Sequence, residues 1–244
     1  MEISLAAEKI VEIGGFPITN SMILSWIVTV LLVITVFIST RRLQTIPSGA
    51  QNVFETVVEG LLGLCNSVIE NEKQTKKYFP LVATIFLFVV LNNWMGLLPG
   101  IGPIGIYEIH HGETILVPLF RSANSDLNTT LALAIITMIG VQVFAISAIG
   151  VSKHIKKFID FRGPINFFVG ILELISEFAK IISFSFRLFG NIFAGEVLLI
   201  VVSFLMPLIA PIPFFFLELF VGFIQALVFA MLALVFIKGA TAVH

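Results

Sequence analysis

Charged residues are scarce in this chain, and that scarcity excludes most soluble folds. Only 12% of the 244 residues are charged and 58% are hydrophobic, whereas about 25% of the residues in a soluble domain are charged. The mean hydropathy is +1.06. Because so little polar surface is available to face water, we expect an integral membrane protein.

The chain has a single cysteine and almost no net charge, and each observation excludes one feature. Cys65 is the single cysteine, so no disulfide can form within the chain. The net charge of −1 offers no basic surface for nucleic acid. No residue pattern indicates a metal site or a cofactor, and we expect neither.

Long stretches without Lys, Arg, Asp or Glu predict the membrane helices, because a spanning helix needs about 20 apolar residues. Lipid offers no partner to unpaired backbone groups, so the fold is predicted to be all-helical. We find no internal repeat and expect a single membrane domain over residues 1–244. Five spans are predicted, at roughly residues 21–40, 79–98, 127–151, 165–206 and 212–238.

Residues 48–72 have a different pattern, with apolar side chains on one helical face and glutamates on the others. The apolar positions are Val53, Val57, Leu61, Leu64 and Val68. This pattern predicts an amphipathic helix at the membrane interface. A helix of the soluble type, packed on other subunits, is the alternative.

Basic residues predict the orientation, because Lys and Arg near span ends stay on the cytoplasmic side. In a five-span arrangement, ten of the 14 basic residues fall on one side. Only Lys9 and Arg121 fall on the other, while Lys180 and Arg187 lie within the membrane. The N-terminus, with Glu2, Glu8 and Glu12, is expected outside and His244 in the cytoplasm.

Arg187 is the most informative single residue, since an arginine at the bilayer centre costs about 2.5 to 3.5 kcal/mol. At 100° per residue, it belongs to one polar stripe on an otherwise apolar helix. The stripe comprises Glu173, Ser176, Lys180, Ser183, Arg187 and Asn191. Such a stripe lines water or a polar partner. The alternative is a salt bridge that fixes helix packing.

Two carboxylates, those of Glu196 and Glu218, lie nearer the loop between the last two predicted helices than Arg187 and Gln225 do. Glu196 is nine residues after Arg187, so it points to the opposite face about 13 Å further along and is too far to be its simple ion-pair partner. On the last helix, Glu218, Gly222 and Gln225 share one face. Two carboxylates in a wet intramembrane site cannot both ionise easily, which suits a proton entry path. Alternatively, Glu218 snorkels at the lipid edge and Gln225 bridges helices.

The lengths of the last two helices predict their packing. Arg187 lies about 28 Å of helix from Met206, whereas Gln225 lies only about 16 Å from Phe214. If Arg187 and Gln225 reach the same depth, the longer helix must run obliquely or bend before Pro207. We therefore expect the last two helices to form a long tilted hairpin.

The segment SFSFRLFGNIFAGE, residues 183–196, resembles the signature of subunit a of F-type ATP synthases. LNNWMGLLPG (91–100), SANSDLN (122–128) and FIQALVFAMLALVFI (223–237) resemble further segments of that family. The resemblance extends from about Ser21 to Lys238.

The resemblance implies roles for individual residues. The essential arginine of the family matches Arg187, and its glutamate matches Glu196. Glu218 stands where some members carry a histidine, so an acid pair replaces an acid and base pair. Glu173 and Lys180, on the polar stripe, are further channel candidates. Other matching positions are Ser183, Asn191 and Gln225 and, near the outer mouth, Asn93, Asp126 and Asn128.

The mechanism implied by the resemblance has two aqueous half-channels that are joined only through the rotor c-ring, with Arg187 separating them. The implied partners are the c-ring, the peripheral-stalk b subunits, the remaining FoF1 subunits, the bilayer and the translocated H⁺ or Na⁺. The chain would be a non-catalytic stator subunit without a nucleotide site. A bacterial inner membrane is the favoured location.

Two other functions compete with this interpretation. A standalone secondary ion transporter also carries intramembrane Arg and Glu, but such carriers usually show an internal duplication. A membrane anchor subunit of a respiratory complex would hold haem or quinone through paired histidines on helices. The four histidines, at 110, 111, 154 and 244, are all expected in loops or at the C-terminal end.

Overall fold

Six long apolar helices build the fold in the computed structural model, which describes residues 7–41, 49–98, 104–110, 113–158, 163–207 and 209–241. All six are long and apolar enough to cross a membrane. They are α1 (Asn20–Thr40), α2 (Ala50–Ile69), α3 (Glu72–Gly96), α4 (Leu127–Ile149), α6 (Pro164–Leu205) and α7 (Pro211–Thr241). The predicted class, an all-α integral membrane protein, is confirmed. The assignment of individual membrane spans stays a prediction, and His244 lies outside the described residues.

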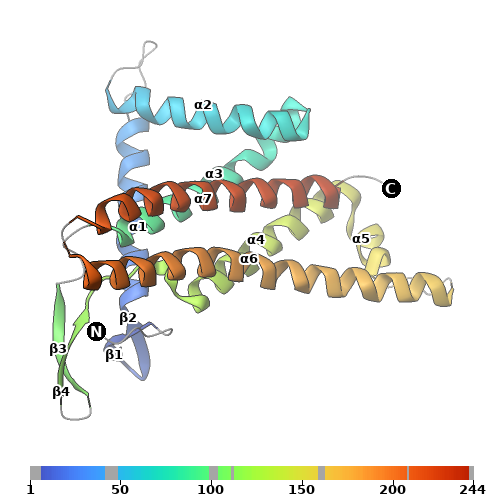
Figure 1. The fold of residues 1–244 in the computed structure, drawn as a ribbon. Coiled ribbons are helices and arrows are strands. Elements are labelled where there is room, and N and C mark those ends of the chain that lie inside the picture. The colour runs from blue at the N-terminus through green and yellow to red at the C-terminus, as the bar shows by residue number, and fades with distance from the viewer. Residues whose placement is uncertain are drawn as a thin grey trace.

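Helix α2 runs in a different direction from α1, the helix that precedes it in the chain. Figure 1 shows it lying across the direction of α1, next to the C-terminal end of α1. Leu61, Cys65 and Ile69 are its buried side chains, and they join the hydrophobic core. An amphipathic helix that lies across a spanning helix suits an interfacial position. The interfacial location of α2 stays a prediction.

Two β-hairpins and a short helix were not predicted. Strands β1 (Lys9–Ile13) and β2 (Phe16–Thr19) form one antiparallel hairpin, and β3 (Gly105–His110) and β4 (Glu113–Pro118) form the other. Helix α5 (Val151–Phe158) joins α4 to α6. The search for apolar spans could not find these elements, because the requirement for helices applies only within the hydrocarbon. Residues 14 and 15, both glycines with positive φ, form the β1–β2 turn.

Short polar side chains fix where three helices begin. Thr19, Asn71 and Asp126 each accept a hydrogen bond from a backbone N–H in the first turn, at the starts of α1, α3 and α4. Such caps satisfy N–H groups that have no partner within the helix. Helix α3 consequently begins at Glu72, ahead of the apolar stretch that predicted it.

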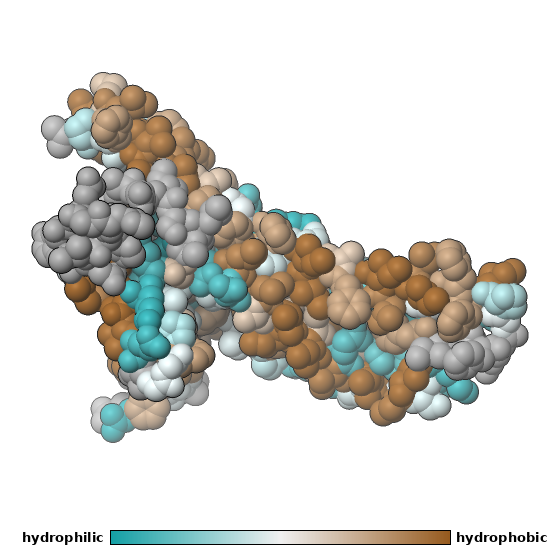
Figure 2. All heavy atoms as spheres, turned by 90° about the horizontal axis from the view of Figure 1, so that it is seen from below, coloured by the Kyte–Doolittle hydropathy of each residue, from teal (hydrophilic) through white to brown (hydrophobic). Residues whose placement is uncertain are grey.

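The core lies where α3, α4, α6 and α7 meet. Ala226, Ala230 and Ala233 of α7 are fully buried, and small side chains let neighbouring helices approach closely. Phe184 of α6 packs edge to face on Phe229 of α7, with ring centroids 4.6 Å apart. Figure 2 shows apolar side chains over most of the long arm seen from below, with hydrophilic residues near the end that carries the hairpins and in smaller patches along the arm.

Helices α6 and α7 run antiparallel with a nearly constant register. Contacts along the pair join Lys180 with Phe236, Phe184 with Phe229, Asn191 with Gln225, and Gly195 with Glu218. The partner of Gln225 is therefore Asn191, one turn beyond Arg187, and the assumption of equal depth for Arg187 and Gln225 was wrong. The helix pair therefore needs no bend before Pro207 to bring Asn191 and Gln225 together. Figure 1 shows the pair lying across the direction of α1, which favours the predicted tilt.

Candidate ion-translocation site

Arg187 lies on the exposed polar face of α6 and borders a cavity. Its Nη2 is 3.4 Å from Ser183 Oγ, its partner one turn earlier. None of the ion pairs among the described residues involves Arg187. This finding disfavours a salt bridge that fixes packing. The cavity has a volume of about 260 Å³ and is lined by Ser176, Ala179, Lys180, Ser183, Phe184 and Arg187 of α6 and by Leu232 and Phe236 of α7.

Asn191 links the polar stripe of α6 to the buried face of α7. Its side-chain amide donates a hydrogen bond of 2.6 Å to Gln225 Oε1. Gln225 is buried, while Asn191 is exposed. The Nε2 of Gln225 has no hydrogen-bond partner among the described residues. Gln225 therefore does bridge two helices, and it keeps one donor that a water or an approaching polar group can use.

Glu218 is buried between the two helices and is not a lipid-edge residue. It is 6% exposed, and its carboxyl group packs directly on Gly195. A side chain at position 195 would occupy the space of that carboxyl group. Glycine at this position thus leaves the recess on α6 that holds the carboxyl group of Glu218.

Asn93 of α3 approaches the same stretch of α7. Its Nδ2 donates to the carbonyl oxygen of Gly222 at 2.8 Å, and its Oδ1 accepts from Asn124 Nδ2 at 2.7 Å. The Asn93 Cβ would lie 3.1 Å from a Cβ at position 222, so a larger residue there would crowd Asn93. A buried polar bridge therefore joins α3, α7 and the 3₁₀ turn Ala123–Ser125.

Glu196 has a cationic neighbour that the sequence analysis missed. Arg121 Nε lies 3.5 Å from Glu196 Oε2 and 3.1 Å from Ser125 Oγ. Arg121 is 8% exposed, and its guanidinium lies 6.0 Å from the centroid of the Phe193 ring. The sequence analysis used Arg121 only for orientation. Arg121 directly precedes the SANSDLN segment, and this position could have indicated that it lies near the site.

The remaining candidates are spread over both ends of the helix pair. Asp126 is buried, caps α4 and accepts a hydrogen bond of 3.0 Å from Ser21 Oγ, so its contacts are those of a structural residue. Asn128 is exposed on α4. At the other end, Glu173 Oε1 pairs with Lys157 of α5 at 2.8 Å, and Lys180 pairs with Glu177 at 2.7 Å.

The polar groups thus form two clusters along the α6–α7 pair. One cluster, near the hairpins, contains Glu196, Glu218, Arg121 and Asn93. The other borders the cavity next to Arg187 and contains Ser176, Lys180 and Ser183. Charged and amide groups placed between apolar helices are characteristic of membrane proteins that carry ions. The fold and the site therefore define a multi-pass membrane protein with polar and charged groups clustered along its two longest helices.

Comparison with known families identifies this membrane protein further. A family model described as ATP synthase A chain matches residues 22–238. Because the match covers nearly the whole chain, the protein belongs to the ATP synthase subunit a family. Its members are the proton-translocating membrane-sector subunits of FoF1 ATP synthase. The resemblance recognised from about Ser21 to Lys238 is confirmed.

Proposed function

We propose that this chain is the stator subunit that supplies two separate half-channels to the rotor c-ring, with Arg187 as the barrier between them. The observation that carries the proposal is the position of Arg187 on the exposed face of α6. The acidic cluster, with buried Glu218 and half-buried Glu196, lies on one side of it along the helix pair, and the cavity lies on the other.

The proposed entry half-channel uses the cluster near the hairpins. Glu218 lies in the recess at Gly195, and Glu196 lies beside Arg121. Both carboxyl groups can accept and release a proton, whereas Asn93 can only orient its neighbours by hydrogen bonds. From this cluster, Asn191 and Gln225 provide polar atoms in the direction of Arg187.

Arg187 then acts on a carboxylate of the ring. A close positive charge favours the ionised form of a carboxyl group, so a ring carboxyl that arrives protonated gives up its proton there. Arginine stays charged and cannot relay that proton, which prevents a shortcut between the half-channels. The proposed exit uses the cavity lined by Ser176, Lys180 and Ser183. Each charge that crosses gains about 2.3 kcal/mol per 100 mV.

The proposal includes an orientation and a set of partners. The N-terminus lies outside and the C-terminus in the cytoplasm of a bacterial inner membrane. The c-ring contacts the Arg187 face of α6, and the peripheral-stalk b subunits hold the chain still. H⁺ is the translocated ion, with Na⁺ as the alternative.

Leucine substitution of both carboxylates tests the entry path. Replacing both Glu196 and Glu218 by leucine removes the proton-accepting groups and excludes water from the cluster. We therefore expect passive proton conductance to fall roughly hundredfold or more. Conductance is measured on membranes stripped of the soluble sector, with assembled complex quantified in parallel. Glu218→His should retain conductance, because an acid and base pair also relays protons.

Glu59→Leu is the matched control, because Glu59 is exposed on α2. This variant should conduct at the native rate. An unchanged conductance in the Glu196→Leu, Glu218→Leu variant, with normal assembly, would remove the two carboxylates from the pathway.

A further inference from the structure

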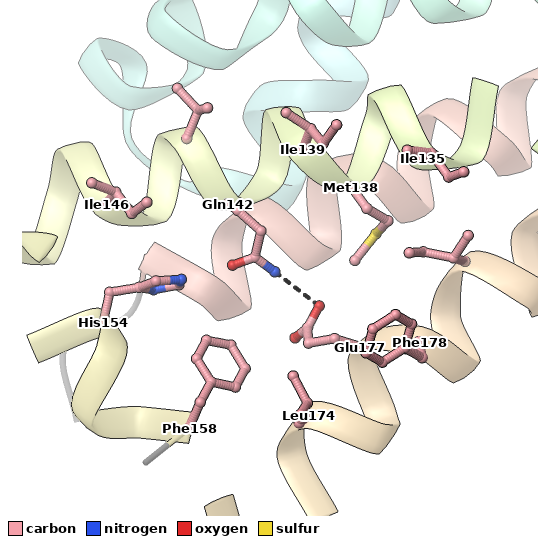
Figure 3. A pocket seen from close by; sticks show the side chains of 12 residues that line it. Ile135, Met138, Ile139, Gln142, Ile146, His154, Phe158, Leu174, Glu177 and Phe178 are labelled. Atoms are coloured by element: carbon pink, nitrogen blue, oxygen red, sulfur yellow. Dashed lines mark hydrogen bonds between the residues drawn. The ribbon is translucent and has the colours of Figure 1, made fainter. Parts of the chain in front are cut away.

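A second and larger cavity lies between α4, α5 and α6, away from the Arg187 face. Its volume is about 490 Å³, within the range of about 300 to 1,000 Å³ typical of ligand sites. Figure 3 shows the residues that line it, among them isoleucines of α4 and phenylalanines of α5 and α6. Three lining residues, Ile139, Val143 and Phe178, are 57%, 58% and 61% exposed. The cavity therefore opens onto an exposed apolar surface of α4 and α6.

Two polar side chains that line this cavity keep atoms without partners. His154 is 7% exposed, and its Nδ1 has no hydrogen-bond partner among the described residues. Gln142 donates from Nε2 to Glu177 at 3.0 Å, but its Oε1 is likewise unpartnered. Figure 3 shows both residues at the same end of the cavity. Buried polar groups are nearly always paired, so these atoms indicate a ligand with polar groups at one end.

The helix that carries His154 is strongly basic. Helix α5 has Lys153, Lys156 and Lys157 within eight residues and no acidic residue. Lys157 pairs with Glu173 of α6. Lys153 and Lys156 are exposed, and none of the ion pairs among the described residues involves them. Neither lysine lines the cavity, but both lie on the short helix that supplies His154 and Phe158 to its wall. A positive charge on this helix is complementary to an anion attached to an apolar chain.

We propose that this cavity binds an anionic phospholipid of the bilayer, with one acyl chain between α4 and α6 and the phosphate at Lys153 and Lys156. The glycerol and headgroup hydroxyls donate hydrogen bonds to Gln142 Oε1 and His154 Nδ1, which have no partner among the described residues. The bound lipid joins α5 to the two long helices. Neither Arg187 nor the acidic cluster contributes to this site, so the proposal is independent of the proposed half-channels.

Photocrosslinking in the whole complex tests the site. The complex is reconstituted in phosphatidylcholine nanodiscs with a small fraction of a probe that carries a diazirine on one acyl chain. The probe is either phosphatidylglycerol or phosphatidylcholine, and labelled peptides are mapped by mass spectrometry. We expect the phosphatidylglycerol probe to label the peptides of α4, α5 and α6 that line the cavity at least about fivefold more than the phosphatidylcholine probe. Labelling of the lipid-facing side of α1 should not differ between the probes.

Two pairs of variants distinguish the contribution of the lysine charges from that of the cavity. Lys153→Gln with Lys156→Gln should abolish the preference for phosphatidylglycerol, whereas Lys73→Gln with Lys76→Gln, at the exposed start of α3, should retain it. Val143→Phe should fill the cavity and lower labelling by both probes. Ile136→Phe, at a position of α4 that is 60% exposed and does not line the cavity, should leave labelling unchanged.

Three results would overturn the proposal. They are equal labelling of the cavity peptides by the two probes, an undiminished preference in the Lys153→Gln, Lys156→Gln variant, and loss of labelling when soluble glycerol phosphate is added. The last result would mean that the anion alone binds, without its acyl chain.

Discussion

Replacing Gly195 by alanine should slow proton flow while leaving the complex assembled. A Cβ at this position would overlap the carboxyl group of Glu218, which is the flexible end of a side chain. Non-bonded carbon contacts are optimal at about 3.5 to 4.0 Å, so the carboxyl group must move by more than about 1 Å. The backbone of α6 has no need to move.

The two effects on stability oppose each other. Alanine within a helix is favoured over glycine by about 1 kcal/mol, whereas extra volume in a packed site costs about 1 to 3 kcal/mol. The net change in stability is therefore small. A displacement of about 1 Å at a reacting group can cost about hundredfold in rate. We accordingly expect passive proton conductance to fall by roughly tenfold to hundredfold in the Gly195→Ala complex.

A second substitution makes this prediction specific. Combining Gly195→Ala with Glu218→Asp shortens the acid by one methylene and should restore much of the conductance. Gly239→Ala, at a position of α7 where a Cβ meets no atom within 4 Å, is the control. Native conductance in Gly195→Ala, measured on stripped membranes at equal amounts of complex, would refute the role given to Glu218.

Two further predictions concern orientation and pH. In a Cys65→Ser background, cysteines introduced at Glu12 and Gly239 should react with impermeant reagents from opposite sides of sealed vesicles, and reaction from the same side would contradict the five-span orientation. Burial, and then the charge of Lys157, lower the pKa of His154 below its usual 6.5, while Glu177 acts in the opposite direction. His154 therefore stabilises the fold above about pH 6.5, and this contribution is lost as the pH falls through the lowered pKa. The melting temperature of the complex should decrease less on acidification in His154→Gln, and equal pH dependence in both proteins would contradict this account.

The sequence predicted the features that depend on hydrophobicity and helical period. Apolar length identified five of the six long helices. A rotation of 100° per residue placed Ser183 and Arg187 on one face, where both border the same cavity. The glutamine at 225 and the glutamate at 218 were likewise placed on a common face of α7, and both are buried. These relations are local, so one helix at a time is enough to derive them.

Contacts between distant segments could not be derived in this way. The approach of Arg121 to Glu196 depends on how the turn before α4 packs on α6. The bridge from Asn93 to Gly222 depends on the position of α3 relative to α7. The equal depth assumed for Arg187 and Gln225 failed for the same reason, because helix lengths alone do not fix the register of a pair.

The central claim is that a permanent, non-transferable positive charge at position 187 separates the two half-channels. Arg187→Lys tests it most directly, because lysine keeps a positive charge but is compact and can lose its proton. The measurement is ATP synthesis by the reconstituted complex under an imposed proton gradient, with assembly checked by the amount of bound soluble sector. We predict that the Arg187→Lys complex assembles and that its synthesis is lost. Synthesis near the native rate in that complex would contradict the role of Arg187 as the separator.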